Sequence, residues 1–340
     1  MAKSHALFLL LLLLLVDACR PSHQQDQNRI SSDDLAALAA VKDSLTDIPG
    51  SNFFSTWDFT SPDPCSAFSG ITCSLNRVTI LTLGNGVSSA RGLAGFLSPS
   101  VSNLTELTQL VLYPGLVTGP IPPQLGLLSN LRVLSLSNNR LKGPIPSSLS
   151  LLPSLHTLDL SYNQLTGTVP PGLFTGLSQL KVMILASNQL SGELPRIVSA
   201  GILHLDLKDN SLTGTLPLRL PSTIRYLSAS KNMMWGSLNG LQSLSEFRVS
   251  RLKHEPIQWA HTFLSLEAPL SSLFLQRNNL SGGVPTSLPS SIFNVRRGIN
   301  RGLEPQSPDR VQGMPAASGG EQLSRPESQC VVFNHGRSIP

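Results

Sequence analysis

A sixteen-residue pattern recurs along this chain and limits what the chain can fold into. Residues 131–146 read LRVLSLSNNRLKGPIP, which follows the frame LxxLxLxxNxLxGxIP. The next copy begins at Leu155, 24 residues after Leu131, and carries the same residue classes at the same offsets. A period of about 20 to 29 residues with this signature predicts a leucine-rich-repeat solenoid, in which every copy adds one coil.

The frame also predicts the structure of one coil. The last two leucines of LxxLxL lie two residues apart and point to one side of an extended segment, while the residues between them point to the other. Each segment is expected to form one rung of a parallel sheet that lines a concave surface. Glycine in GxIP allows a positive φ, and proline fixes φ where the chain turns to the convex side. Each coil buries about five aliphatic side chains, at roughly 1.5 to 3 kcal/mol apiece, only if another coil covers it.

Asparagine at the ninth frame position is predicted to turn inward, where its amide can bond the backbone of its own and adjacent coils. Gly115 replaces it in one coil. In the coil expected from Leu244 the position falls on Leu252, so we expect the ladder to be interrupted there. Trp259, with Phe263 and Leu266, is expected to pack inward in an irregular coil, and a ligand anchor is the alternative role for Trp259. The predicted ladder residues are Asn139, Asn163, Asn188, Asn210, Asn232 and Asn278.

About nine coils are expected over residues 77–289. Leucine pairs on the return side of the early coils, such as Leu125 with Leu128, predict short helical turns. The coils over residues 196–223 are too short for helical turns and are expected to return in extended form. The insertion GNGVSSARG at residues 84–92 matches a dinucleotide fingerprint only in part and is expected to be a surface loop. The first coil starts at Arg77 and the others at Leu107, Leu131, Leu155, Leu180, Ile202, Ile224, Leu244 and Leu270.

The two ends of the chain differ from the repeats. Residues 1–18 combine a basic start, an apolar run and the small residue Ala18, which predicts a secretory signal peptide. A lipoprotein site at Cys19 is the alternative, and Asp17 disfavours it. Residues 290–340 are rich in Arg, Pro, Ser, Gly and Gln without periodicity and predict a disordered tail. Cys330 has no cysteine nearby to form a second cap, so the last coil is expected to be uncovered, as in a truncated or alternatively spliced relative of a longer protein.

Residues 19–76 are expected to form an N-terminal cap. A helix is predicted at about residues 32–47, because Ser31 or Ser32 can cap its start and leucine and valine residues recur along one face. Two cysteines as close as Cys65 and Cys73 in an exported chain are expected to pair. The resulting small loop would seal the exposed end of the first coil, which has no neighbour of its own.

The predicted helix, the segment from Trp57 to Cys73 and the LxGxIP repeats resemble the plant extracellular leucine-rich-repeat proteins. That group includes receptor-kinase ectodomains, receptor-like proteins without a kinase, and polygalacturonase-inhibiting proteins. The resemblance covers roughly residues 31–289. It implies an α/β repeat fold: a right-handed solenoid with a concave parallel β-sheet, a helical cap with one disulfide, and binding of peptides, proteins, steroids or glycans on one scaffold.

Catalysis, metal binding and nucleic-acid binding have little support in the sequence. His156, Asp159 and Ser161 lie on one rung, but alternating strand positions expose all three without bringing a base onto a nucleophile. The four cysteines and seven histidines show no clustered ligand spacing, so no metal or other cofactor is expected. The 25 basic and 20 acidic residues are dispersed, which is unlike a nucleic-acid footprint.

Binding is expected on the concave strip, on residues between the buried leucines. Convergent arginines beside a tyrosine would suit a carboxylate, either of a peptide terminus or of an acidic wall polysaccharide, and solubilising charge is the alternative reading. Two sequons place glycans at Asn103 and Asn279. The candidate ligand-binding residues are Tyr162, Lys181, His204, Asp206, Arg225, Tyr226, Arg248, Arg251 and Arg277.

We therefore predict a secreted, non-enzymatic binding module of the apoplast or cell wall without a membrane span. It would act in plant signalling or defence through an extracellular protein, a peptide or an acidic glycan, with a receptor kinase as one possible partner. The alternatives are an inhibitor of a secreted polygalacturonase-type hydrolase and a structural wall component.

Overall fold

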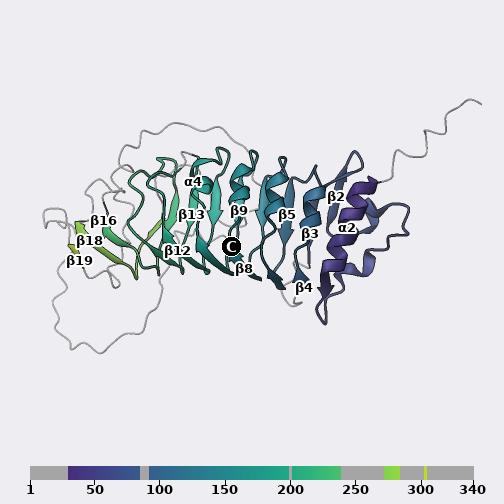
Figure 1. Cartoon of the computed structure of the whole chain (residues 1–340), viewed down its shortest axis with the longest axis horizontal. Coiled ribbons are helices and arrows are strands. Elements are labelled where there is room, and N and C mark those ends of the chain that lie inside the picture. The colour runs from purple at the N-terminus through teal and green to yellow at the C-terminus, as the bar shows by residue number, and fades with distance from the viewer. Residues whose placement is uncertain (1–29, 85–91, 199–200, 239–271, 284–301, 305–340) are drawn as a thin grey trace, which may run out of the picture. The chain divides into compact units, whose positions relative to one another are not determined.

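The repeat frame forms short strands that pair in chain order. The computed structural model describes residues 30–84, 92–198, 201–238, 272–283 and 302–304 (Figure 1). All of them belong to the compact unit Met1–Pro305, and a second unit spans Gln306–Pro340. The predictions for the signal segment, Cys19, the insertion after Gly84, Trp259 and its neighbours, and Cys330 lie outside the described residues.

The rungs form a nine-stranded sheet within the described residues. β2 pairs with β3 in antiparallel fashion, and all later pairs are parallel. Figure 1 shows these strands following one another from the purple end of the chain to the green. The strands are β2 (Ile71–Ser74), β3 (Arg77–Leu83), β5 (Gln109–Leu112), β7 (Val133–Ser135), β9 (Thr157–Asp159), β11 (Val182–Ile184), β13 (His204–Asp206), β15 (Tyr226–Ser228) and β17 (Ser272–Phe274).

The second half of each frame also forms strands, which the sequence analysis did not predict. Gly143 has φ +80° as expected of the GxIP step, yet it lies within a strand. Six of these strands and β1 (Leu45–Asp47) of the cap make a seven-stranded sheet. The six strands are β4 (Leu93–Phe96), β6 (Leu116–Gly119), β8 (Arg140–Pro144), β10 (Gln164–Thr168), β12 (Gln189–Glu193) and β14 (Ser211–Thr213). A three-stranded sheet contains β16 (Trp235–Ser237), β18 (Asn279–Gly283) and β19 (Gly302–Glu304).

The frame leucines form the core. Leu131, Leu134, Leu136 and Leu141 are 0% exposed, and Ile145 is 3% exposed. Equivalent residues of successive coils belong to one hydrophobic cluster, so each coil covers the apolar side of the next. The fold is the predicted leucine-rich-repeat solenoid.

The return segments change along the chain as predicted. The early coils return through short helical turns. In the later coils, the described residues of the return segments after β12 and after β14 form no helix, and an isolated parallel bridge joins Ile197 to Arg219. A helical turn needs more residues than these later coils contain. The helical returns are η2 (Pro99–Asn103), η3 (Pro123–Leu127), η4 (Ser147–Leu151) and α4 (Gly172–Thr175).

The N-terminal cap differs from the prediction in the length of its helix. The helix α2 spans Ser32–Ser44, and the last three residues of the predicted range form β1 instead. β1 pairs with β4, which gives its backbone groups partners while burying Leu45. Ser31 is the N-cap residue by position, but its side chain makes no capping hydrogen bond.

Aromatic packing and one disulfide close the rest of the cap. Cys65, in α3 (Pro64–Ala67), is bonded to Cys73, which confirms the predicted pair. Trp57, just after η1 (Phe53–Thr56), is 1% exposed and stacks on Phe68 at 5.1 Å between ring centroids. Its indole N–H donates to the Ser69 carbonyl at 2.9 Å. These contacts cover the open end of the first coil.

The expected interruption of the asparagine ladder near the C-terminus is wrong. β15 pairs directly with β17, so no strand from the coil expected at Leu244 lies between them and the ladder is not interrupted. Coil stacking depends only on matching strands, and β17 matches β15 although Leu273 follows its partner Leu227 by 46 residues. Within the predicted disordered tail, β19 pairs with β18, because the edge of β18 offers unpaired backbone groups.

Candidate binding face

The strand face is the solvent side of the nine-stranded sheet, formed by the residues between the buried leucines. On its later rungs, Val182 lies opposite His204, which lies opposite Tyr226. In the next row, Ile184 lies opposite Asp206. Because strands in a sheet lie about 4.8 Å apart, side chains in one row contact one another directly.

An aromatic row crosses the last rungs of the strand face. The rings of His204 and Tyr226 are stacked with centroids 4.1 Å apart and an interplanar angle of 1°. Phe274 on β17 lies opposite Ser228, in the neighbouring row, and its ring lies diagonally beside Tyr226 with 5.7 Å between the ring centroids. These three rings together are called the aromatic row. Burial lowers the pKa of His204, although Asp206 and Asp159 oppose this effect. The imidazole is therefore neutral near pH 7, and the row has a largely apolar surface.

A charged pair lies beside the aromatic row. Asp206 is only 5% exposed, and its carboxylate accepts the Lys208 backbone N–H at 3.0 Å. The Lys208 ammonium lies 3.5 Å from the same carboxylate. Burial lowers the pKa of Lys208, but the attraction of Asp206, Tyr162 and Tyr226 outweighs it and raises that pKa overall. Burial, followed by the Asp206 charge, also raises the pKa of Tyr226. At neutral pH the site presents one fixed cation and a phenol hydroxyl.

The residue before each ladder asparagine adopts a left-handed conformation. Tyr162 has φ 54° and is 50% exposed, and Arg277 has φ 58°. Asp209 accepts a hydrogen bond from the Ser187 hydroxyl at 3.1 Å and lies 3.8 Å from the Lys231 ammonium. This row therefore borders the strand face with one tyrosine and mixed charges.

Basic residues follow one another along the opposite border, where the rungs begin. The backbone N–H of His156 donates to the Arg132 carbonyl, and that of Lys181 donates to the His156 carbonyl. The same backbone bonds continue along this border: the Leu203 N–H donates to the Lys181 carbonyl, and the Arg225 N–H donates to the Leu203 carbonyl. Arg132, Lys181 and Arg225 thus place cationic side chains along this border, with His156 and Leu203 on the coils between them.

The ladder asparagines have the partners expected for coil-to-coil bonding. Asn163 is 8% exposed, accepts the Leu141 N–H at 3.0 Å and donates to the Leu136 carbonyl at 2.9 Å, both in the preceding coil. Asn278 makes the equivalent bonds to Met234 and Ala229. The other predicted ladder residues bond the preceding coil in the same way.

The structure brings several predicted site residues together. Asp206, Tyr162 and Tyr226 all lie close enough to the Lys208 ammonium to raise its pKa, and His204 stacks on Tyr226. Lys181 and Arg225 lie at the basic border, and Arg277 is one of the left-handed residues that precede the ladder asparagines. Arg248 and Arg251 lie outside the described residues. Phe274 was missed, although its place between two buried leucines in SLFLQ marks it as an outward residue.

The one rung with catalytic residue types does not form a catalytic triad. The Nδ1 atom of His156 lies 2.6 Å from the Ser154 carbonyl oxygen rather than on a nucleophile. Asp159 accepts both the hydroxyl and the backbone N–H of Ser161. Among the described residues, no three His, Cys, Asp or Glu side chains gather as metal ligands.

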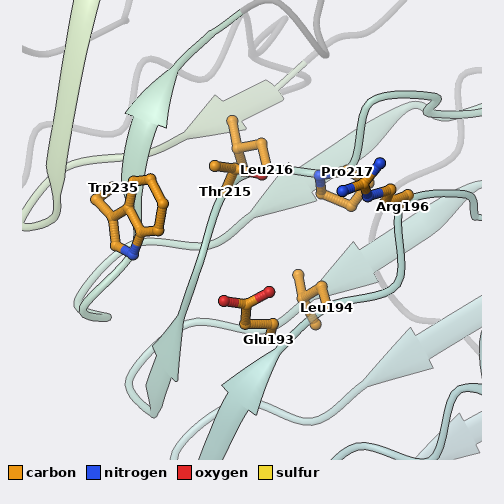
Figure 2. Close-up of a pocket in the computed structure, with 7 residues that line it drawn as sticks. All are labelled: Glu193, Leu194, Arg196, Thr215, Leu216, Pro217 and Trp235. Atoms are coloured by element: carbon orange, nitrogen blue, oxygen red, sulfur yellow. The ribbon is translucent and has the colours of Figure 1, made fainter.

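A separate shallow pocket of about 170 Å³ lies at the second half of the later coils. Figure 2 shows Trp235 and Arg196 on its opposite sides, with Thr215 and Leu216 between them. Trp235 is 50% exposed, which is unusual for a large aromatic side chain. Its strand β16 pairs with β18, which carries the sequon residue Asn279. The other sequon residue, Asn103, is exposed in η2.

The repeats and the cap define the class of protein. Residues 31–74 match the leucine rich repeat N-terminal domain, and residues 129–171 match a model of two leucine rich repeats. The chain therefore has a plant-type leucine-rich-repeat cap followed by leucine-rich repeats, and it is similar to plant receptor-kinase ectodomains. No helix within the described residues is long and apolar enough to span a bilayer.

Particular relatives resemble parts of this chain. Receptor-like kinase TMK2 of Arabidopsis thaliana is 36% identical over 93 residues, which are 27% of this chain and 9% of that protein. The PEPR1–AtPEP1 crystal structure matches at 26% identity and a TM-score of 0.56, over 77% of this chain and 37% of that chain. The ectodomain of the A. thaliana receptor kinase GASSHO1/SCHENGEN3, in complex with CASPARIAN STRIP INTEGRITY FACTOR 2, matches at 29% identity and a TM-score of 0.59. That match covers 74% of this chain and 28% of the ectodomain chain. The chain thus spans well under half the length of each of these relatives.

Proposed function

We propose that this protein is a secreted, non-enzymatic recognition module that binds an extended peptide segment across β13, β15 and β17. The observation that carries the proposal is the aromatic row of His204, Tyr226 and Phe274 beside the Asp206–Lys208 pair. Binding sites commonly combine an apolar surface with a few fixed polar groups that orient the ligand. This part of the strand face has both.

The sheet also reduces the entropy lost on binding. His204 and Tyr226 stand on strands that are paired on both sides, and their rings are stacked on each other, so little side-chain freedom remains to be lost when a ligand packs on them. Tyrosine is among the residues that dominate binding energy at interfaces. The Lys208 ammonium can bind a ligand carboxylate, and Asp206 holds that ammonium in place.

The proposed biological role is receptor-like recognition in plant signalling or defence. Support comes from the similarity to receptor-kinase ectodomains, one of which was crystallised with CASPARIAN STRIP INTEGRITY FACTOR 2. Signal transmission would then pass through a partner such as a receptor kinase.

The basic border supports a second candidate function. Arg132, His156 and Lys181 occupy successive coils and could bind an acidic wall glycan, or a hydrolase that acts on one. The protein would then inhibit a polygalacturonase-type enzyme by blocking its cleft. Dose-dependent loss of polygalacturonase activity would favour this candidate over peptide recognition.

The peptide proposal is tested by capture from apoplastic extract, followed by affinity measurement with the captured partner. Tyr226→Ala should weaken binding at least tenfold, since a central aromatic residue can contribute about 2 kcal/mol or more. Tyr113→Ala is the matched control, because Tyr113 is also half-buried but follows the early strand β5. Equal affinity of the Tyr226→Ala variant and the wild type would refute the proposed site.

A further inference from the structure

Trp235 and Asn279 are direct cross-strand neighbours. In the parallel pair of β16 and β18, Trp235 lies opposite Asn279 and Gly236 lies opposite the buried Leu280. Trp235 and Asn279 are both exposed, so their side chains lie on the same face of the sheet. Adjacent strands lie about 4.8 Å apart, which is close enough for a group attached to Asn279 to contact the indole.

The backbone holds both residues in place. The Trp235 N–H donates to the Gly214 carbonyl at 2.9 Å, and the Asn279 N–H donates to the Met234 carbonyl at 2.8 Å. On the Asn279 side, the ladder residue Asn278 accepts the Met234 N–H at 3.0 Å. A group attached to Asn279 would therefore start from a fixed position beside Trp235.

Asn279 begins the sequence Asn-Leu-Ser, an N-glycosylation sequon whose Ser281 is also exposed. We propose that Asn279 carries an N-linked glycan whose first N-acetylglucosamine packs against the indole of Trp235. This inference rests on the secretion that the proposed function requires, but not on peptide binding by the strand face.

The chemistry of the two surfaces fits. A sugar ring has an apolar C–H face and a polar rim, and indole offers a flat apolar surface at low cost in side-chain entropy. The glycan would then cover an aromatic side chain that is 50% exposed in the protein alone.

Met233 provides a matched control on the same surface. It is 56% exposed and lines an open depression together with Asn279, so it could also lie under a glycan. Its side chain is flexible and has no flat face. Coupling of the glycan to Trp235 but not to Met233 would therefore distinguish ring packing from general crowding.

The test uses the full chain, secreted from a eukaryotic host that makes high-mannose glycans. Glycopeptide mass spectrometry should find Asn279 occupied, and an unmodified Asn279 would overturn the proposal. Oxidative footprinting should find Trp235 protected in the glycosylated protein. Protection should persist after an endoglycosidase leaves one sugar on the asparagine, and should be lost after complete deglycosylation. Equal oxidation of Trp235 in all three forms would also overturn it.

A double-mutant cycle gives an independent readout that requires no chemical probe. Asn279→Gln and Trp235→Ala should each lower the midpoint of thermal unfolding by about 2 °C, and the double variant by little more than either alone. Asn103→Gln combined with Trp235→Ala, and Asn279→Gln combined with Met233→Ala, should be additive. Additivity of the Asn279 and Trp235 changes would refute the contact even if the glycan is present.

Discussion

Replacing Asn163 by alanine tests whether buried asparagines hold adjacent coils together. The change removes the acceptor of the Leu141 N–H and the donor to the Leu136 carbonyl, both in the preceding coil. It also removes two longer bonds from Asn163 to the carbonyls of Leu160 and Ser161 in its own coil. Asn163 is 8% exposed, so bulk water cannot readily replace these partners.

The expected magnitude follows from the two groups in the preceding coil. Each buried polar group left without a partner costs about 1 to 3 kcal/mol. Partial relaxation favours the lower part of the combined range, so Asn163→Ala should destabilise the solenoid by about 2 to 4 kcal/mol. Urea unfolding measures this as a lower midpoint, and amide exchange at Leu141 should become faster.

Asn130→Ala is the control for burial. The Asn130 side chain also reaches the preceding coil, donating to the Thr105 carbonyl at 3.3 Å and the Glu106 carboxylate at 3.1 Å, but it is exposed. Water can replace those bonds, so the cost should stay within about 0.5 kcal/mol. Equal midpoints for the two variants would refute the argument that burial makes the ladder stabilising.

Three further predictions concern the cap, a repeat glycine and the strand face. Gly70 and Gly143 both have φ +80°, but a Cβ on Gly70 would lie 2.0 Å from a carbonyl oxygen while one on Gly143 meets open space. Urea midpoints should show a loss of about 1 kcal/mol for Gly143→Ala, from backbone strain alone, and of more than about 4 kcal/mol for Gly70→Ala. Asp34→Asn should cost about 3 kcal/mol by the same measurement, because Asp34 is fully buried and binds Arg77 through both carboxylate oxygens; an unchanged midpoint would contradict this. The folded-state pKa of His204 lies below its ordinary value of 6.5, so the unfolded chain takes up this proton first as the pH falls. Stability should therefore decline as the pH falls through about 6.5 and stop declining, as far as this group is concerned, below the folded-state pKa. His204→Gln should flatten that part of a plot of stability against pH, and an unchanged slope would contradict the assignment.

The sequence predicts the core and the rungs because the leucine spacing and strand geometry have the same period. Residues such as Leu134 and Leu136 could be assigned to the interior from the frame alone. The strands of the second sheet were not predictable in the same way. Arg140–Pro144 contains glycine and proline, which usually mark turns, and it becomes a strand because the equivalent segments of neighbouring coils lie beside it.

The sequence predicts which residues of the candidate site point outward, but it does not predict which of them contact one another. The frame identifies His204, Asp206 and Tyr226 as outward residues, and the register shows which of them meet. Asp34 illustrates the limit of local reasoning. Its place in the first turn of a helix suggests a solvated charge that favours the helix dipole, yet its partner Arg77 lies 43 residues away in β3. Only the docking of the cap on the first coil brings them together.

Because β15 pairs directly with β17, the number of stacked coils does not follow from the length of the chain alone. Asn278 bonds Ala229 across 49 residues in the same way that the other ladder asparagines bond the preceding coil across 25 to 28 residues. The stack therefore requires only that matching strand edges meet, so the register of one coil on the next does not depend on how many residues lie between their strands in the sequence.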